Sequence, residues 1–283
     1  MPSLNLLLQA LAAGVFMGAL YGLIGLGLGL GWGILKQINL AHFAWVFLSA
    51  YLTYEFKTRF GVDPLLSLLM LVPAFALLGA LLQAVLSKFA ITPFNSLMAT
   101  FGIAVSVEAL LQLFWSADFR RMASPYDEMK FRFGGIIVTY SESITIVLAV
   151  LACAFVSWML YKTDVGRSVR AAAEDAEIAQ AFGINAHQLS LALAGVCAGL
   201  AACAGVCVAL TFTLAPSQIF AWIGVIFAVV MMGRLASAWA PLFAGLVVGI
   251  SESMTMAITA PTWAPLVSFT LLILILLLRR GHD

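Results

Sequence analysis

Residues 5–35 read NLLLQALAAGVFMGALYGLIGLGLGLGWGIL and contain no Lys, Arg, Asp or Glu. A helix that crosses a membrane needs about 20 consecutive apolar residues, so this run is long enough to cross and too long to stand perpendicular to the bilayer. Every second residue from Gly25 to Gly33 is glycine, so the glycines circle the helix and do not form one face. Because glycine in a lipid-embedded helix marks either close packing or a break, we expect local unwinding near the end of this segment.

The composition of the whole chain agrees with its first segment. Of 283 residues, 63% are hydrophobic and 10% are charged, and the mean hydropathy is +1.07. A soluble domain has about 25% charged residues, so this chain has too few to cover a water-facing surface. This excludes a soluble enzyme, a disordered protein and a disulfide scaffold. The formal net charge of +1, without a basic stripe, also argues against a nucleic-acid partner.

The chain divides into apolar segments that are continuous and rich in Leu and Ala, unlike the alternating strands of a membrane barrel. The segments are residues 5–35, 40–54, 65–86, 94–116, 142–161, 189–212, 216–233, 239–260 and 263–278. We therefore predict an all-α integral-membrane protein, a polytopic helical bundle of about nine transmembrane segments, in which residues 1–283 form a single transmembrane domain. The 4 cysteines lie in apolar runs without His or Asp beside them, so we expect no metal site.

Two connections between these segments stand out by their charge. Residues 117–141 and 162–188 together hold just over half of the charged side chains of the chain. If residues 162–188 lie in the cytoplasm, the inner side carries slightly more Lys and Arg than the outer side, which favours this orientation only weakly. A stronger signal comes from the second connection itself.

Residues 163–189 read TDVGRSVRAAAEDAEIAQAFGINAHQL. Its alanines have the highest helix propensity, Thr163 or Asp164 can cap the start, and Gly183 followed by Ile184 is a typical helix stop. We predict a short amphipathic helix between two membrane spans. By these features alone it is either a helical surface loop or a docking element whose small residues let a partner close around it.

Residues 177–183, EIAQAFG, resemble the E-A-A-x-x-x-G motif of permease subunits of ABC importers, with Ile178 in place of the first Ala. Further pieces resemble, in the same order, the permeases of the high-affinity branched-chain amino acid uptake family. They are INLAH at 38–42, ATFGI at 99–103, GRSVRA at 166–171 with GIN at 183–185, and VVMMGRLAS at 229–237 with GISE at 249–252. Phe43 and Arg234 depart from that family, whose members usually have glycine at both positions, where the resemblance places the lining of the path.

The resemblance implies a membrane-spanning permease subunit of an ATP-driven ABC importer for small amino acids, branched-chain or hydrophobic ones first. It implies no catalytic residue and no cofactor on this chain, because ATP is bound and hydrolysed by two separate ATPase subunits; the chain itself has no P-loop motif. It also implies an external substrate-binding protein and a second permease, with a related partner favoured over a second copy. The setting is the bacterial inner membrane.

The resemblance assigns the connection of residues 162–188 to coupling. Its helix would dock on an ATPase subunit through Gly166, Arg167, Arg170, Asp175, Glu177, Ala179, Gly183 and Ile184. This connection must then be cytoplasmic, which places the N-terminus outside and the C-terminus inside the cell.

The transport path must come from polar groups at membrane depth, where ionisable side chains are costly and mark functional sites. The candidates are Asn39, His42, Thr100, Glu108, Arg234 and Glu252. Glu108 or Glu252 would meet the ammonium group of an amino acid, and free backbone N–H groups of residues 31–39 would meet its carboxylate. The alternative for each Glu is a hydrogen bond that supports a neighbouring helix, and for His42 a cap on backbone carbonyls.

Two other classes of protein are weighed against this assignment. A membrane hydrolase is disfavoured because H-E-x-x-H is absent and residues 249–253, GISES, lack the last glycine of a nucleophile elbow. A secondary transporter or channel is the nearer rival, and it would have no need of the docking helix. Among ABC importers, urea, short amides and small organic acids are the alternative cargoes.

Overall fold

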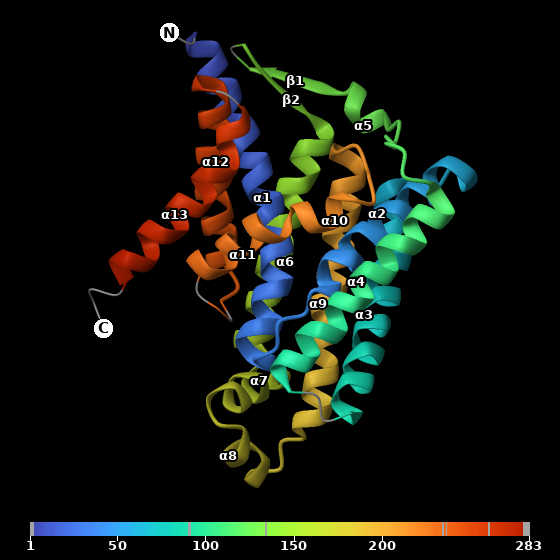
Figure 1. The fold of residues 1–283 in the computed structure, drawn as a ribbon, viewed down its shortest axis with the longest axis vertical. Helices are drawn as coiled ribbons and strands as arrows, with labels where there is room; N and C mark the ends of the chain where they lie inside the picture. The colour runs from blue at the N-terminus through green and yellow to red at the C-terminus, as the bar shows by residue number, and fades with distance from the viewer. Residues whose placement is uncertain are drawn as a thin grey trace.

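The computed structural model describes residues 3–89, 92–133, 135–233, 235, 237–259 and 261–279. It is a bundle of helices with one small hairpin (Figure 1). The long helices are α1 (Leu4–Leu35), α2 (Ala41–Phe60), α3 (Pro64–Lys88), α4 (Pro93–Trp115), α6 (Tyr140–Lys162), α9 (Ala186–Thr211) and α12 (Ala240–Ile258). The shorter helices are α5 (Pro125–Glu128), α7 (Asp164–Glu174), α8 (Ala176–Ala181), α10 (Gln218–Ala221), α11 (Ile223–Met232) and α13 (Ala264–Arg279), with a 3-10 turn at Pro261–Trp263. β1 (Lys130–Phe133) and β2 (Ile136–Thr139) pair antiparallel.

Helices coincide with all of the predicted apolar segments, but not all of them are long and apolar enough to cross a membrane. Among the described residues, 6 helices meet that condition: α1, α3, α4, α6, α9 and α12. α11 has 10 residues, and at about 1.5 Å per residue it covers roughly half of a hydrocarbon layer of about 30 Å. α2 carries Glu55, Lys57 and Arg59 near its end. The chain is a multi-pass membrane protein, and the predicted count of about nine spans is not confirmed.

α1 is the central helix of the bundle, and the unwinding predicted for it is wrong. It stays helical to Leu35, and the chain turns only at Lys36, whose φ is 55°. The alternating glycines have neighbours on different sides of the helix: Gly25 faces α11, whereas Gly27 faces α2 and α9. Glycine at every second position therefore lets several helices approach one intact helix closely.

α12 packs antiparallel along α1 through small residues on both helices. A Cβ atom on Gly18 would lie 2.6 Å from the carbonyl oxygen of Gly245, and one on Gly22 would lie 2.7 Å from the Cα atom of Leu242. Both distances are too short for a side chain, so only glycine permits this approach. Close contact between the two backbones holds these helices together.

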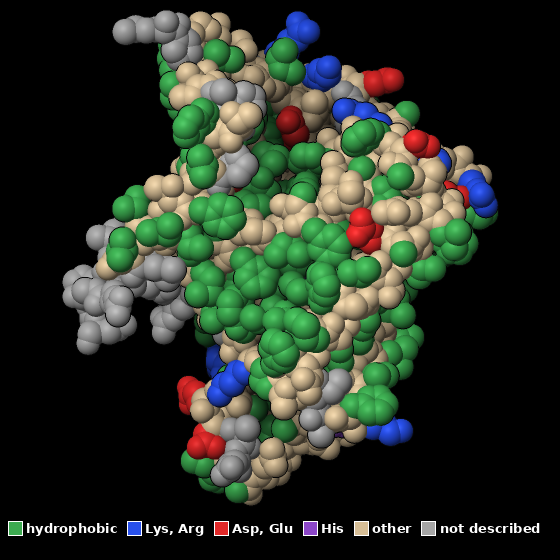
Figure 2. All heavy atoms as spheres, in the orientation of Figure 1, with side chains coloured by type: hydrophobic (Ala, Val, Ile, Leu, Met, Phe, Trp, Pro, Cys, Tyr) green, Lys and Arg blue, Asp and Glu red, His purple; other side chains and the backbone are tan. Residues whose placement is uncertain are grey.

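The outer surfaces of α3 and α4 are apolar and exposed. Only 22% of the most apolar part of each helix is buried, compared with 78% in α9. Figure 2 shows apolar side chains covering the middle of one face, with most charged side chains toward its two ends. A continuous apolar surface over two long helices is unfavourable in water, and it is the expected surface of a protein that lies in lipid.

The two ends of the bundle are built differently (Figure 1). The start of α1, the hairpin of β1 and β2, and α5 lie at one end, and α7 and α8 lie at the other. We call these the hairpin end and the α7–α8 end. The helices of the bundle therefore present two different surfaces to the two sides of a membrane.

Candidate functional site

The connection between α6 and α9 folds into two short helices at the α7–α8 end. Thr163 begins α7, since its hydroxyl oxygen accepts a hydrogen bond from the N–H of Gly166 (3.1 Å). The next residue after α7, Asp175, is extended (φ −147°, ψ 108°). Its carboxylate accepts a hydrogen bond from the N–H of Ile178 (3.0 Å) and so begins α8. The predicted single helix is therefore two helices, because an Asp side chain that caps the second helix competes with continuation of the first.

α8 ends where the sequence predicts. Gly183 has a φ of 86°, in the left-handed region. Its N–H donates to the carbonyl of Gln180 (2.9 Å), and the N–H of Ile184 donates to the carbonyl of Ala179 (3.1 Å). These two bonds define a Schellman motif, so the helix stop at Gly183 is confirmed.

α7 is attached to the C-terminal end of α6. Gly166 is buried, and a Cβ atom there would collide with carbonyl oxygens in the last turn of α6. Arg170 lies over the ring of Tyr161, with 4.9 Å between its guanidinium carbon and the ring centroid. Arg167 forms an exposed ion pair with Asp164 within α7 itself. α7 is therefore packed directly against the end of a helix long and apolar enough to cross a membrane.

α8 and the turn after it carry exposed apolar side chains. Ile178 is 58% exposed and Phe182 is 85% exposed, whereas Ala179 between them is 4% exposed. Two exposed apolar side chains at the α7–α8 end, away from the apolar middle of the bundle, are typical of a contact with another protein. Neither residue was among the docking residues predicted from the sequence, although both lie in the EIAQAFG motif, because exposure depends on how the helix packs. Glu177 lies on α8, and its side chain is outside the described part of the chain.

Three of the predicted path residues meet where α1 gives way to α2. The N–H of Leu40 donates to the hydroxyl oxygen of Thr100 (3.1 Å), and His42 Nε2 lies 3.1 Å from the carbonyl oxygen of Ile24. Asn39 lies in the non-helical linker just before α2. His42 therefore contacts a backbone carbonyl, and Thr100 fixes the linker that joins the two helices.

A small polar cavity, the junction cavity, lies beside this linker. Its volume is about 30 Å³, room for about one water molecule. Asn39 Oδ1 and Ser96 Oγ are buried without a hydrogen-bond partner among the described residues, and Gln83 and His42 also line the cavity. Because a buried polar atom without a partner is costly, these groups are suited to binding a water molecule. Ser96 gave no signal in the sequence, where it is one serine at the start of an apolar segment.

Glu252 lies in a larger cavity of about 380 Å³, the Glu252 cavity, among α1, α11, α12 and α13. Its carboxylate accepts hydrogen bonds from the Tyr21 hydroxyl (3.0 Å) and from the Ser268 hydroxyl. Trp222 and Phe269 supply aromatic walls. A carboxylate between aromatic rings suits an ammonium group, although its two hydrogen bonds also tie α12 to α1 and α13. Tyr21 and Ser268 were missed because they lie on other helices, and the sequence does not show which faces of those helices meet Glu252.

Glu108 lines neither of these cavities. Glu108 is half-buried on α4 and accepts a hydrogen bond from Gln112 Nε2 (3.2 Å), one turn further along the same helix. Arg234 lies outside the described residues. Of the path candidates that the structure describes, Asn39 and His42 line the junction cavity and Glu252 lines its own cavity, whereas Glu108 lies apart from both.

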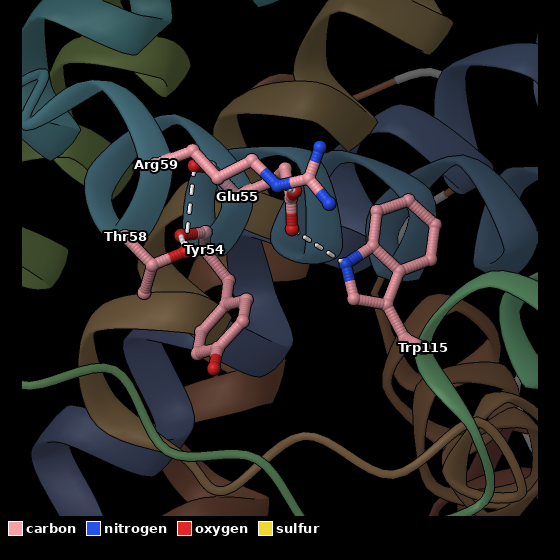
Figure 3. Close-up of polar contacts among 5 residues, drawn as sticks. All are labelled: Tyr54, Glu55, Thr58, Arg59 and Trp115. Carbon is pink, nitrogen blue, oxygen red and sulfur yellow. Dashed lines mark hydrogen bonds and ion pairs between the residues drawn. The ribbon is translucent and has the colours of Figure 1, made fainter.

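At the hairpin end, polar contacts fasten the ends of α2 and α4 to each other (Figure 3). Glu55 accepts a hydrogen bond from Trp115 Nε1 (2.9 Å) and forms an ion pair with Arg59. Nearby, the Tyr126 hydroxyl donates to Asp63 (2.6 Å). This hydrogen bond, together with partial burial, raises the pKa of Tyr126 to about 12, so the bond persists at neutral pH.

Comparison with known proteins identifies the family. The family model described as "Branched-chain amino acid transport system / permease component" matches residues 10–276. The chain is 26% identical to the high-affinity branched-chain amino acid transport system permease protein BraD of Pseudomonas aeruginosa, over 99% of this chain and 96% of the relative. It is also 26% identical to the corresponding permease protein LivH of Escherichia coli, over 95% and 92% of the two chains.

A third curated relative carries a different substrate in its name. The fructose import permease protein FrcC of Rhizobium meliloti is 26% identical over 96% of this chain and 76% of its own length. No solved structure matches the chain significantly. The family match covers nearly all of the apolar segments and the whole α7–α8 segment. The chain therefore belongs to the family of permease components of branched-chain amino acid transport systems.

Proposed function

We propose that this chain is the membrane-spanning subunit of an ATP-driven importer of small amino acids, with branched-chain and other hydrophobic amino acids as the first candidates. The observation that carries the proposal is the α7–α8 segment. It presents the exposed side chains of Ile178, on α8, and Phe182, in the turn after it, next to a helix that rests on the end of α6. A channel or a secondary transporter has no need of such a docking surface.

The partners and the orientation follow from docking. An ATPase subunit binds the α7–α8 segment, so this end of the bundle faces the cytoplasm, the N-terminus lies outside and the C-terminus lies inside. Two ATPase subunits, a second and related permease, and an external substrate-binding protein complete the importer. ATP is bound by the ATPase subunits, and this chain supplies no cofactor site, no metal site and no catalytic residue. Residues 1–283 act as one transmembrane domain.

The path of the cargo follows one side of α1. Met17 and Tyr21 line the Glu252 cavity, and Leu28 and Leu35 line the junction cavity. With about 3.6 residues per turn, these four positions lie on the same side of the helix. Glu252 receives the ammonium group, and the polar atoms of the junction cavity lie further along the same route.

The docking role can be tested with one substitution and a matched control. Phe182→Asp places a charge where a partner would bury an aromatic ring, so it should abolish co-purification of the ATPase and ATP-driven leucine uptake. Phe60 is 70% exposed at the hairpin end, and Phe60→Asp should leave the ATPase bound. Normal co-purification of Phe182→Asp would refute docking through α8.

The cargo is tested on the reconstituted importer. Labelled leucine uptake should depend on ATP and should be competed by valine and isoleucine, but not by fructose or urea. Competition by fructose alone would assign the chain to a sugar importer such as the relative from Rhizobium meliloti is named for. Uptake driven by a proton or sodium gradient, without ATP, would instead support a secondary transporter.

A further inference from the structure

A third cavity, of about 330 Å³, lies toward the hairpin end between α1, α6 and the segment that joins α4 to α6. We call it the hairpin-end cavity. In Figure 2, a hollow near this end holds an acidic side chain, with basic side chains around its rim. The polar residues that line the cavity are Arg121, Lys130, Thr139, Ser141, Glu142, Thr145 and Thr211. The volume is at the lower end of the range of about 300–1,000 Å³ that small-molecule sites occupy.

Glu142 is fixed in this cavity by the fold. Its Oε2 atom accepts hydrogen bonds from the N–H and from the hydroxyl of Thr139, both at 2.8 Å. The bond from the Thr139 N–H belongs to a capping box that begins α6. A carboxylate held in this way presents its charge at a defined position, so little side-chain ordering is needed when a ligand binds.

The cavity combines three kinds of lining. Arg121 and Lys130 bring positive charge, Glu142 brings negative charge, and Phe16 and Leu20 belong to an apolar wall. An α-amino acid with a hydrophobic side chain carries the complementary groups: a carboxylate, an ammonium group and an apolar chain. A sugar or urea carries neither charge.

We propose that the hairpin-end cavity is the site where this permease first receives an α-amino acid as a zwitterion. Glu142 binds the ammonium group, Arg121 and Lys130 bind the carboxylate, and the apolar wall holds the side chain. This inference rests on the proposed import of amino acids, because the orientation derived there makes the hairpin end the entry side.

The hairpin-end cavity adjoins the Glu252 cavity. Met17 lines both of them. Phe212 lines the first and Trp222 lines the second, and their rings pack edge to face with centroids 5.3 Å apart. These three side chains form the partition between the cavities. A cargo that passes the partition exchanges one carboxylate for another, so its ammonium group keeps a counter-charge on both sides.

Protection of an introduced cysteine tests the site without relying on transport. Thr211 lines the cavity, and its hydroxyl donates to the carbonyl of Cys207 one turn earlier in α9 (2.7 Å), so Thr211→Cys should disturb little. In the importer assembled with its partner subunits in lipid nanodiscs, leucine should slow labelling of this cysteine by a methanethiosulfonate reagent. Leucine analogues without the ammonium group (4-methylpentanoate) or without the carboxylate (3-methylbutylamine) should not. The parent chain, whose native cysteines are buried or half-buried, sets the background.

Variants that remove one charge at a time test whether the basic and the acidic side chains of the cavity bind the cargo. Lys130→Gln and Glu142→Gln should each raise the leucine concentration for half-protection at least tenfold. Glu142→Gln keeps an oxygen that can accept the capping hydrogen bonds, and Lys130→Gln decides the matter if Glu142→Gln does not fold. Arg132→Gln, on the same strand but not among the residues that line the cavity, should behave like the parent.

The outcomes separate this inference from the proposed function. If the importer takes up leucine but leucine does not protect Thr211→Cys, or the two analogues protect as well as leucine, the zwitterion site is refuted. The zwitterion site is also refuted if leucine protects Thr211→Cys equally well with and without the Lys130→Gln substitution. If the parent importer takes up no amino acid, the proposed function is refuted, and with it the premise of the site.

Discussion

Gly183 illustrates how one residue shapes a docking surface through its backbone alone. A Cβ atom at this position would meet nothing within 4 Å, so space does not require glycine. The φ of 86° does. An L-residue pays about 1–2 kcal/mol for the left-handed conformation, and Gly183→Val should therefore distort the end of α8, weaken co-purification of the ATPase severalfold and lower transport, while the membrane spans stay folded.

The control for Gly183→Val comes from the other end of the bundle. Gly61 ends α2 with a φ of 66° and also has open space around it. Gly61→Val carries the same conformational cost at a site far from α8, so it should leave ATPase binding unchanged. An equal loss of binding in both variants would mean that general destabilisation, and not the shape of the α8 end, is the cause.

Glu252 poses a second question at the scale of one residue, since the same carboxylate lines a cavity and links three helices. Glu252→Gln removes the charge but keeps an oxygen that can accept the Tyr21 hydrogen bond. If the charge serves the cargo, leucine uptake should fall at least tenfold while thermal unfolding in detergent and ATP hydrolysis change little. Tyr21→Phe removes one hydrogen bond, worth about 0.5–1.5 kcal/mol, and should lower stability with a smaller loss of uptake. The opposite ranking would make Glu252 a structural group.

Among the elements, the pair of α1 and α12 sets the geometry on which the cavities depend. Gly245 faces the carbonyl oxygen of Gly18 so closely that any Cβ atom must push the helices apart. Gly245→Val should cost about 1–3 kcal/mol, the usual range for overpacking, and lower the unfolding temperature in detergent. Gly102 on α4 has nothing within 4 Å of its Cβ position, so Gly102→Val serves as the matched control. Equal effects of the two variants would contradict the close α1–α12 contact.

At the scale of the whole molecule, the apolar middle and the two unlike ends define how the chain stands in a bilayer, and the docking role defines which end is inside. Gln180 is exposed at the α7–α8 end and Ala117 is exposed at the hairpin end. In intact cells, a membrane-impermeant thiol reagent should label Ala117→Cys, and it should label Gln180→Cys only after the membrane is opened. The reverse pattern would refute the orientation and the docking role together.

The sequence by itself predicts the features that depend on residues close together in the chain. Apolar length and scarcity of charge in residues 5–35 predicted a membrane-embedded helix, because hydrophobicity and length are properties of a continuous segment. The stop at Gly183 and the cap at Thr163 were predictable for the same reason, since the bonds that end or begin a helix join residues within six positions. Glu252, Asn39 and His42 could be named as polar groups at membrane depth.

The tertiary structure decided which of these residues meet. The glycines of α1 suggested a break, and only the positions of α9, α11 and α12 around the helix show that they are contact points. Glu252 accepts hydrogen bonds from Tyr21 and Ser268 on two other helices, and Asn39 lines one cavity together with Ser96, which lies on α4. The apolar sequence of each helix is compatible with many rotations and neighbours. The final arrangement depends on the shapes of several helices packed at once, which no single segment encodes.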